Sequence, residues 1–184
     1  MRRRSNFAAT AMALLLVAFL AGDALGQTAK QPFVGSWTIV SADTVRPDGT
    51  RVPNFGSGPK GFLVFDGSGR YALQIMSANR AKFASNNRLE GTPEENKSVV
   101  QGMIAHFGRY SVNEADRTFT FQVENSSFPN WEGTAQKRPF TITADQLKYS
   151  VAAASGGGSG EVVWKRVNPN PKITQAARRC PSRV

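Results

Sequence analysis

Short runs in which apolar and polar residues alternate recur along this chain, and tight turns separate them. In residues 70–76, Tyr71, Leu73 and Ile75 take every second position, and residues 118–124 alternate in the same way. Successive side chains of a β-strand point to opposite faces, so this spacing predicts strands with one buried face and one wet face. We therefore expect an all-β, antiparallel fold.

Turn residues between these runs predict how the strands connect. Proline presets φ and glycine accepts the positive φ that closes a hairpin, so Pro47, Asp48 and Gly49 predict a turn after the first run. Eight main strands joined mostly to their sequence neighbours predict an up-and-down antiparallel eight-stranded barrel, which removes exposed sheet edges. Further hairpins are expected for 61–66 with 70–76, 109–113 with 118–124 and 138–143 with 146–151, and the glycine-rich stretch 155–160 leads into a last strand at 161–166.

One segment, residues 92–107, has helical rather than strand spacing. Thr92, Pro93 and Glu95 supply an N-cap, a first-turn proline and a capping-box acid. Gly108 is expected to end this helix, and we expect the helix to lie against an end or wall of the barrel. The apolar residues that share one face at helical spacing are Val99, Val100, Met103, Ile104 and Phe107.

The first 26 residues are typical of a secretory signal peptide, with Arg2, Arg3 and Arg4 before an apolar run at 7–21. This run is shorter than the roughly 20 residues that span a bilayer, which disfavours the alternative of an uncleaved anchor. Cleavage before Gln27 would leave no integral membrane segment. The predicted localisation is periplasmic or secreted, with a leader at 27–32 and a barrel domain at 33–167.

Charge and cysteine content exclude several classes of function. The formal net charge is +10, but much of the excess lies in a proline-containing tail, 168–184, that we expect to be disordered. Nucleic acid is therefore not an expected partner, although the tail could make weak contact with anionic envelope components. Cys180 and His106 are single residues of their kinds, so neither an internal disulfide nor a conventional zinc site is expected, and no cofactor is predicted.

The opening of the first strand, Gly35, Ser36 and Trp37, resembles the glycine-any-tryptophan signature of lipocalins. With it, further segments resemble the bacterial lipocalin-like domain family over about 33–167: the strand opening through Ser41, Ala42 and Asp43 with the 47–49 turn, then 82–86, 91–95, 128–131 and 163–165. The resemblance implies that Trp37 closes the bottom of the barrel, with Lys165 or Arg166 against its ring in a cation–π contact. The mid-chain helix and the lack of paired cysteines depart from many secreted lipocalins.

Residues 76–91 form a long polar segment that would be unusual in a small domain without a function. As a lid over the barrel mouth, it would present basic groups to an anionic or carbonyl group of a ligand. The alternative is a solvated connector. The candidate ligand-binding residues in this segment are Arg80, Lys82, Phe83 and Arg88.

Residues 125–133 form a second candidate rim, since Phe128 and Trp131 are large apolar groups outside a regular strand. Trp131 could equally well lie against the helix or the barrel end, and Glu132 could bind a ligand or form a surface ion pair. His106 lies at the margin of the apolar stripe, where it could serve as an acid–base group or make a structural hydrogen bond.

Three functions are compatible with this sequence. The first is an exported protein that binds a small, mostly apolar or amphipathic molecule in the barrel lumen. The second is a cofactor-free enzyme that acts on such a molecule, with His106 or a carboxylate as acid or base and no other catalytic residue indicated. The third is an envelope interaction protein with a filled barrel and a basic tail. Whether the chain is an enzyme is left open, with binding preferred.

Overall fold

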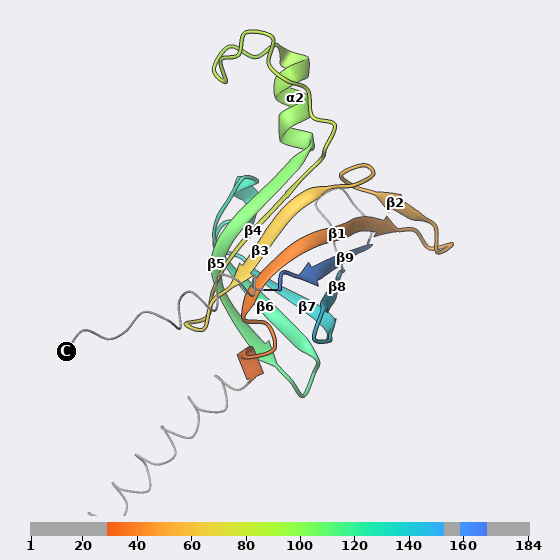
Figure 1. Cartoon of the computed structure of the whole chain (residues 1–184), viewed down its shortest axis with the longest axis vertical. Helices are drawn as coiled ribbons and strands as arrows, with labels where there is room; N and C mark the ends of the chain where they lie inside the picture. Colours follow the sequence, from red (N-terminus) through yellow and green to blue (C-terminus); the bar gives the residue numbers. More distant parts are fainter. Residues whose placement is uncertain (1–28, 153–158, 169–184) are drawn as a thin grey trace, which may run out of the picture.

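Each strand of this sheet pairs with a neighbour, and the first strand also pairs with the last (Figure 1). The computed structural model describes residues 29–152 and 159–168. β2 pairs with the end of β1, and the other eight strands close into an antiparallel barrel, which confirms the predicted fold class. The strands are β1 (Gly35–Val45), β2 (Arg51–Pro53), β3 (Lys60–Phe65), β4 (Arg70–Met76), β5 (Met103–Asn113), β6 (Thr118–Ser126), β7 (Ala135–Ile142), β8 (Gln146–Val151) and β9 (Ser159–Arg166).

The predicted signal peptide, part of the glycine-rich stretch and nearly all of the basic tail with Cys180 lie outside the described residues. Within the described part of the chain, no helix has the length and apolar character needed to cross a bilayer.

The predicted hairpins form with inward side chains in the expected phase. In the β3–β4 hairpin, Leu63 lies opposite Leu73, and both side chains are buried. Asp66 holds the turn, because its carboxylate accepts a hydrogen bond from the Arg70 backbone N–H at 2.8 Å, and Gly69 supplies a φ of 91°. The alternation that was read from the sequence is therefore the alternation between barrel interior and solvent.

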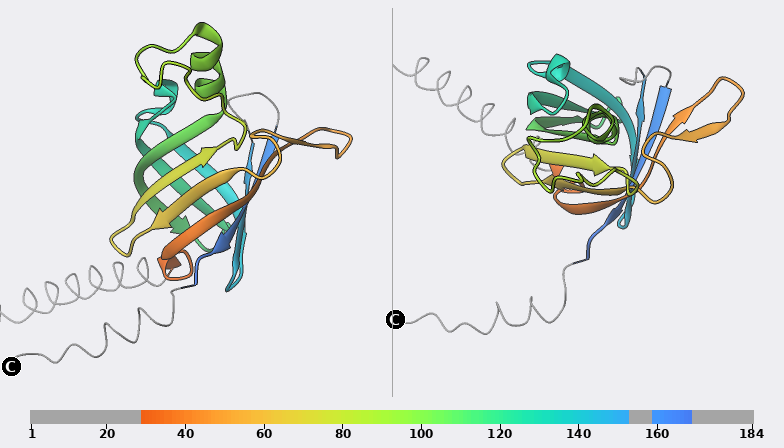
Figure 2. Two further views of the ribbon diagram at one scale, coloured as in Figure 1. Left: turned by 45° about the horizontal axis from the view of Figure 1, so that its top comes forward. Right: turned by 90° about the horizontal axis from the view of Figure 1, so that it is seen from above.

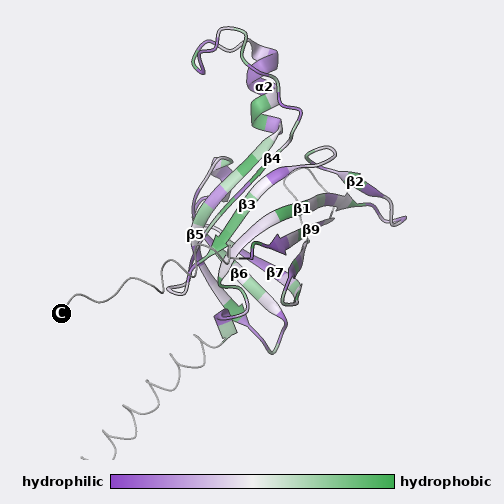
Figure 3. Ribbon diagram, viewed as in Figure 1, coloured by the Kyte–Doolittle hydropathy of each residue, from purple (hydrophilic) through white to green (hydrophobic). Residues whose placement is uncertain are grey.

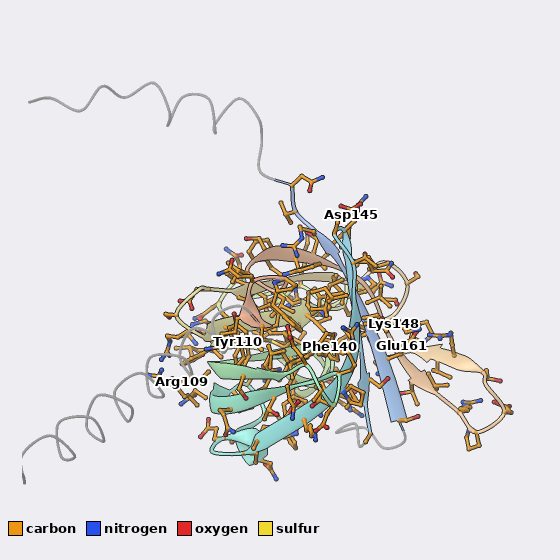
Figure 4. All side chains as sticks on the ribbon, turned by 90° about the horizontal axis from the view of Figure 1, so that it is seen from below. Arg109, Tyr110, Phe140, Asp145, Lys148 and Glu161 are labelled. Carbon is orange, nitrogen blue, oxygen red and sulfur yellow. The ribbon has the colours of Figure 1, made fainter. Side chains whose placement is uncertain are left out.

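Aromatic side chains fill the end of the barrel opposite α2 (Pro93–Gln101), and we call this set the aromatic plug. Phe33 lies at its centre, with ring centroids 4.8 Å from Phe140 and 5.5 Å from Phe65. Viewed from below, Tyr110 and Phe140 lie inside the ring of strands and Arg109 lies outside (Figure 4). Burial of these rings is nearly complete, which is typical of a close-packed interior. The fully buried members of the plug are Trp37, Trp164, Phe33, Phe65 and Phe119.

Arg166 closes the plug from outside, at the seam between β1 and β9. Its guanidinium carbon lies 4.0 Å from the ring centre of Trp37, and the guanidinium donates to the backbone carbonyls of Val34 at 2.9 Å and Ala144 at 2.7 Å. Trp37 in turn donates its indole N–H to the Phe33 carbonyl at 2.9 Å. Of the two basic residues expected near Trp37, Lys165 is exposed, and Arg166 makes the contact.

α2 is shorter than the predicted helix, and this is a correction to residues 92–107. The capping box of Thr92 and Glu95 is present as expected, but Gly102 caps the helix by donating its N–H to the Ser98 carbonyl at 2.9 Å. The Gly102 carbonyl then accepts the Ser77 N–H at 2.8 Å, so the chain joins the ladder with β4 from Met103 onward.

The residues expected on the second half of the helix therefore belong to β5. Ile104 and His106 point inward, whereas Phe107 is 45% exposed on the outer face. Gly108 does not end a helix; a Cβ at this position would lie 2.0 Å from the Gln122 carbonyl oxygen, so β6 approaches here too closely for any other residue.

α2 stands beyond the barrel rather than flat against its wall (Figures 1 and 2). None of its residues is buried, and Val100 is 73% exposed. Figure 3 shows mostly hydrophilic residues along α2, with apolar residues in the turn nearest β5. The expected close contact with an end or wall of the barrel is thus limited to the base of the helix.

Replacement of Arg166 by methionine should lower the free energy of unfolding by about 2 kcal/mol, because it removes the contact with Trp37 and the bonds to backbone carbonyls. Lys165→Met removes the same charge from an exposed neighbour and should change stability by less than about 0.5 kcal/mol. Urea unfolding followed by tryptophan fluorescence measures both. Equal losses in the two variants would show that the Arg166 contacts do not hold the seam.

Candidate functional site

The end of the barrel that carries α2 contains a cavity of about 490 Å³. Its walls are mostly apolar. Its polar side chains come mainly from β5, β7 and β8, which place His106, Gln136, Arg138 and Tyr149 on the inner face. The lining residues are Ala42, Thr44, Asn54, Phe55, Leu73, Ile75, Val100, Gln101, Met103, Ile104, His106, Phe121, Phe128, Trp131, Gln136, Arg138, Tyr149, Val151 and Val162.

The cavity floor rests on the aromatic plug. Phe121 and Tyr149 form this floor and contact Phe119 of the plug, with ring centroids 4.8 Å and 5.4 Å away. The opposite end is bordered by Val100 and Gln101 of α2 and by the segment around the 3₁₀-helix η1 (Pro129–Trp131). The aromatic plug therefore closes one end of the lumen, and α2 and the η1 segment border the other end.

His106 and Tyr71 form a hydrogen-bonded pair at the floor. The Tyr71 hydroxyl lies 2.8 Å from His106 Nδ1, and both side chains are buried. Burial lowers the pKa of His106 to about 4, with a further contribution from the Arg138 charge. Burial also raises the pKa of Tyr71, so at neutral pH His106 is neutral and Tyr71 keeps its proton. The tyrosine hydroxyl donates in this bond when Nδ1 is unprotonated, and it accepts when Nδ1 carries the imidazole proton.

Arg138 points into the cavity from β7, in phase with Gln136 and Phe140. Its guanidinium donates to Gln136 Oε1 at 2.5 Å and to the Lys137 backbone carbonyl at 3.2 Å. Burial lowers its pKa, since water that would solvate the charge is partly excluded. The sequence contained a signal for this residue, because Arg138 lies two positions before the inward Phe140, but it was not among the predicted site residues.

Tyr149 completes the polar floor and was likewise missed. Burial raises the pKa of its hydroxyl to about 12, so the group is a hydrogen-bond donor at neutral pH. Trp164 lies beside it and lowers that pKa, although the indole N–H has no well-formed hydrogen bond within the described residues. An indole N–H can donate but cannot accept, so Trp164 leaves the Tyr149 proton free.

Three of the predicted binding residues line the cavity: His106, Phe128 and Trp131. Trp131 packs edge-on against both of the others, with ring centroids 5.6 Å from His106 and 5.8 Å from Phe128. Glu132 is exposed and accepts a long bond of 3.5 Å from the Ser126 backbone N–H. The segment 125–133 thus contributes the aromatic rings of Phe128 and Trp131 to the cavity, and the Glu132 carboxylate is not part of the lining.

The other four predicted residues, Arg80, Lys82, Phe83 and Arg88, do not line the cavity. Their segment is held by α2 instead: Glu95 accepts the Ala84 N–H at 2.9 Å, and Ser98 accepts the Ala81 N–H at 3.0 Å. Because α2 extends beyond the barrel, the segment extends with it. Arg80 donates to the Ser77 carbonyl at 3.1 Å, just after β4, and Lys82 and Arg88 are exposed, so the choice between a lid and a solvated connector stays a prediction.

A second hollow of about 500 Å³ lies beside the outward side chains of β3, β4 and β5, including Phe62 and Phe107.

In the described ranges, no cluster of three or more histidine, cysteine, aspartate or glutamate side chains could hold a metal ion. The described residues that line the cavity offer hydrogen bonds, one positive charge and aromatic contact.

Residues 34–167 match the profile of the lipocalin-like domain, which is most of the chain. The chain belongs to this lipocalin-like family. Over 85 residues it is 32% identical to the 4'-hydroxy-3'-methoxypropiophenone carrier protein ppsC of Aspergillus oryzae, a match that covers 43% of this chain and 77% of that protein.

Two solved structures are similar to this lipocalin-like barrel. EF1p2_mFAP2b bound to DFHBI has a TM-score of 0.38 and 14% identity, with coverage of 78% of this chain and 99% of that one. A mutant of the fluorescent protein UnaG has a TM-score of 0.33 and 12% identity, with coverage of 73% and 96%.

The stability of this lipocalin-like barrel should fall as the pH falls from about 6.5 to about 4. In this window the unfolded state binds a proton at His106 that the folded state does not bind, so unfolding becomes easier by up to about 3 kcal/mol. His106→Gln cannot titrate and should lose less stability over the same window. Urea unfolding at several pH values measures the difference; parallel curves for the two proteins would contradict the pKa assigned to His106.

Proposed function

We propose that this protein is an exported carrier that binds a small, mostly apolar molecule in the upper half of its barrel. The observation that carries the proposal is the cavity of about 490 Å³ above the aromatic plug. Its volume falls within the range of small-molecule sites, and an apolar wall with a few convergent polar groups is typical of such sites.

The composition of the wall supports an apolar ligand body. Ile75, Ile104 and Val162 supply aliphatic surface, and Phe128 and Trp131 supply aromatic surface nearer the mouth. Transfer of apolar ligand surface from water into this environment stabilises the complex by about 25 cal/mol per Å². The polar groups of the floor would orient the ligand.

The relative from Aspergillus oryzae supports the same class of ligand. The compound in its name is a phenyl ketone with one hydroxyl and one methoxy group. It is small and mostly apolar, with polar atoms confined to a few oxygens. The open upper lumen also favours a carrier over the alternative of a filled barrel that acts through its basic tail.

Native mass spectrometry of the protein, purified from its producing cells without detergent, tests the carrier proposal. We expect a stoichiometric adduct that organic solvent extracts and that can be identified in the extract. A bare protein mass, together with failure to bind any member of a panel of small apolar compounds, would contradict the proposal.

Partial filling of the lumen should weaken ligand binding. Ala42→Phe adds a ring to an inward position in the cavity wall, and overlap with the ligand should weaken binding by about tenfold or more. Ala135→Phe adds the same ring to an exposed position of β7 and should bind as the parent protein does. Circular dichroism checks that both variants are folded. Retention of the adduct by Ala42→Phe would place the ligand outside the lumen.

Export is supported by the basic and apolar pattern of residues 1–26. The N-terminal residue of the protein recovered from the periplasm or medium of a bacterial host should be Gln27. Recovery of the uncleaved chain in the cytoplasm would remove export from the proposal and leave the binding function untouched.

A further inference from the structure

Among the described residues that line the cavity, one side chain is charged, and it forms no ion pair with the others. Apart from Arg138, this part of the lining holds no aspartate, glutamate, lysine or second arginine. The ion pairs found among the described residues join other basic side chains to carboxylates and do not include Arg138. A guanidinium stays protonated in proteins, so Arg138 presents a fixed positive charge to the lumen.

An unpaired charge in a partly dry cavity costs free energy, since water is removed without a compensating anion. The bonds from Arg138 to Gln136 and to the Lys137 carbonyl are to neutral acceptors, which leave its charge uncompensated. A structural arginine would normally have a carboxylate nearby. This arrangement is therefore better explained by an anion that arrives with the ligand.

The groups around Arg138 are also suited to an anion. The Tyr149 hydroxyl and the neutral His106 imidazole line the same cavity as Arg138. Burial keeps the Tyr149 hydroxyl protonated at neutral pH, so it can donate a hydrogen bond. Among the described residues, the floor thus combines neutral polar groups with one positive charge and offers no anionic acceptor.

We propose that the ligand is a monocarboxylic acid with an apolar body, and that its carboxylate binds the Arg138 guanidinium while Tyr149 donates a hydrogen bond to it. This inference rests on the proposed carrier function and specifies its ligand class. The planar guanidinium fork matches the two oxygens of a carboxylate. One negative charge balances the single positive charge, whereas a doubly charged phosphate would bring an excess negative charge into the lumen.

Matched acids and amides test the inference. We would titrate the protein near pH 7.5 with 1-naphthaleneacetic acid, 4-biphenylacetic acid and 4-phenylbutanoic acid, each beside its primary amide, by isothermal titration calorimetry. The amide keeps the shape and removes the charge. The best-fitting acid should bind about 10- to 100-fold more tightly than its amide, the range expected for a charge-assisted hydrogen-bonded pair.

Arg138→Gln should remove this preference. The variant should lose about 10- to 100-fold in affinity for the acid and less than about twofold for the amide, so amide binding also shows that the barrel is folded. Lys137→Gln is the matched control, because it removes the same charge from the adjacent, exposed position of β7 and should bind both compounds as the parent does.

The outcomes separate the two proposals. If acid and amide bind equally and Arg138→Gln changes neither, the carrier function stands and the carboxylate inference is overturned. If the amide binds more tightly than the acid, the inference is overturned as well. If no acid and no amide binds, and no adduct is found by mass spectrometry, the carrier function fails and the inference fails with it.

The ligand-free protein gives a second readout. If the Arg138 charge is unpaired without ligand, Arg138→Gln should raise the melting temperature by about 2 to 4 °C, since a costly buried charge is removed. A fall of the same size, with acid binding unchanged, would assign Arg138 a structural role and overturn the inference.

Discussion

Pairing of β1 with β9 turns a sheet with two free edges into a barrel with an interior. The seam is not uniform: its register shifts between Ile39 and Ser41, and Arg166 secures its lower end against Trp37. Once the seam is closed, the inward side chains of all eight barrel strands share one space. The aromatic plug and the cavity above it both depend on this closure, because an open sheet would leave the same residues in water.

Most of the fold could be predicted from the sequence because alternation and turn chemistry are local signals. The phase of Tyr71, Leu73 and Ile75 was correct, as was the capping box at Thr92. The helix boundary was wrong because Met103, Ile104 and Phe107 fit a helical period, whereas in β5 Ile104 and His106 alternate inward. Pairing between β4 and β5, a contact distant in sequence, decided between the two.

The site was harder to predict than the fold because it depends on which strands face one another. Prediction favoured basic residues in the long segment before α2, and the hydrogen bonds of that segment to Glu95 and Ser98 could not be read from spacing alone. Arg138 was missed because a charged residue in a strand is usually solvated. Arg138 lies two positions before the buried Phe140 in β7, so both side chains are on the inner face of the barrel. The alternation within the strand was therefore a better guide to the binding residues than the length of the segment before α2.

Within the described residues, the aromatic plug closes one end of the lumen, so a ligand of the proposed kind would enter and leave at the end that carries α2. The carboxylate of the proposed acid would pass Phe128 and Trp131 first and would lose hydration before it reaches Arg138. The apolar end of the acid would then stay nearest the mouth. Release would require the carboxylate to leave Arg138 while the rest of the ligand still fills the path of incoming water, and this would favour a long residence time.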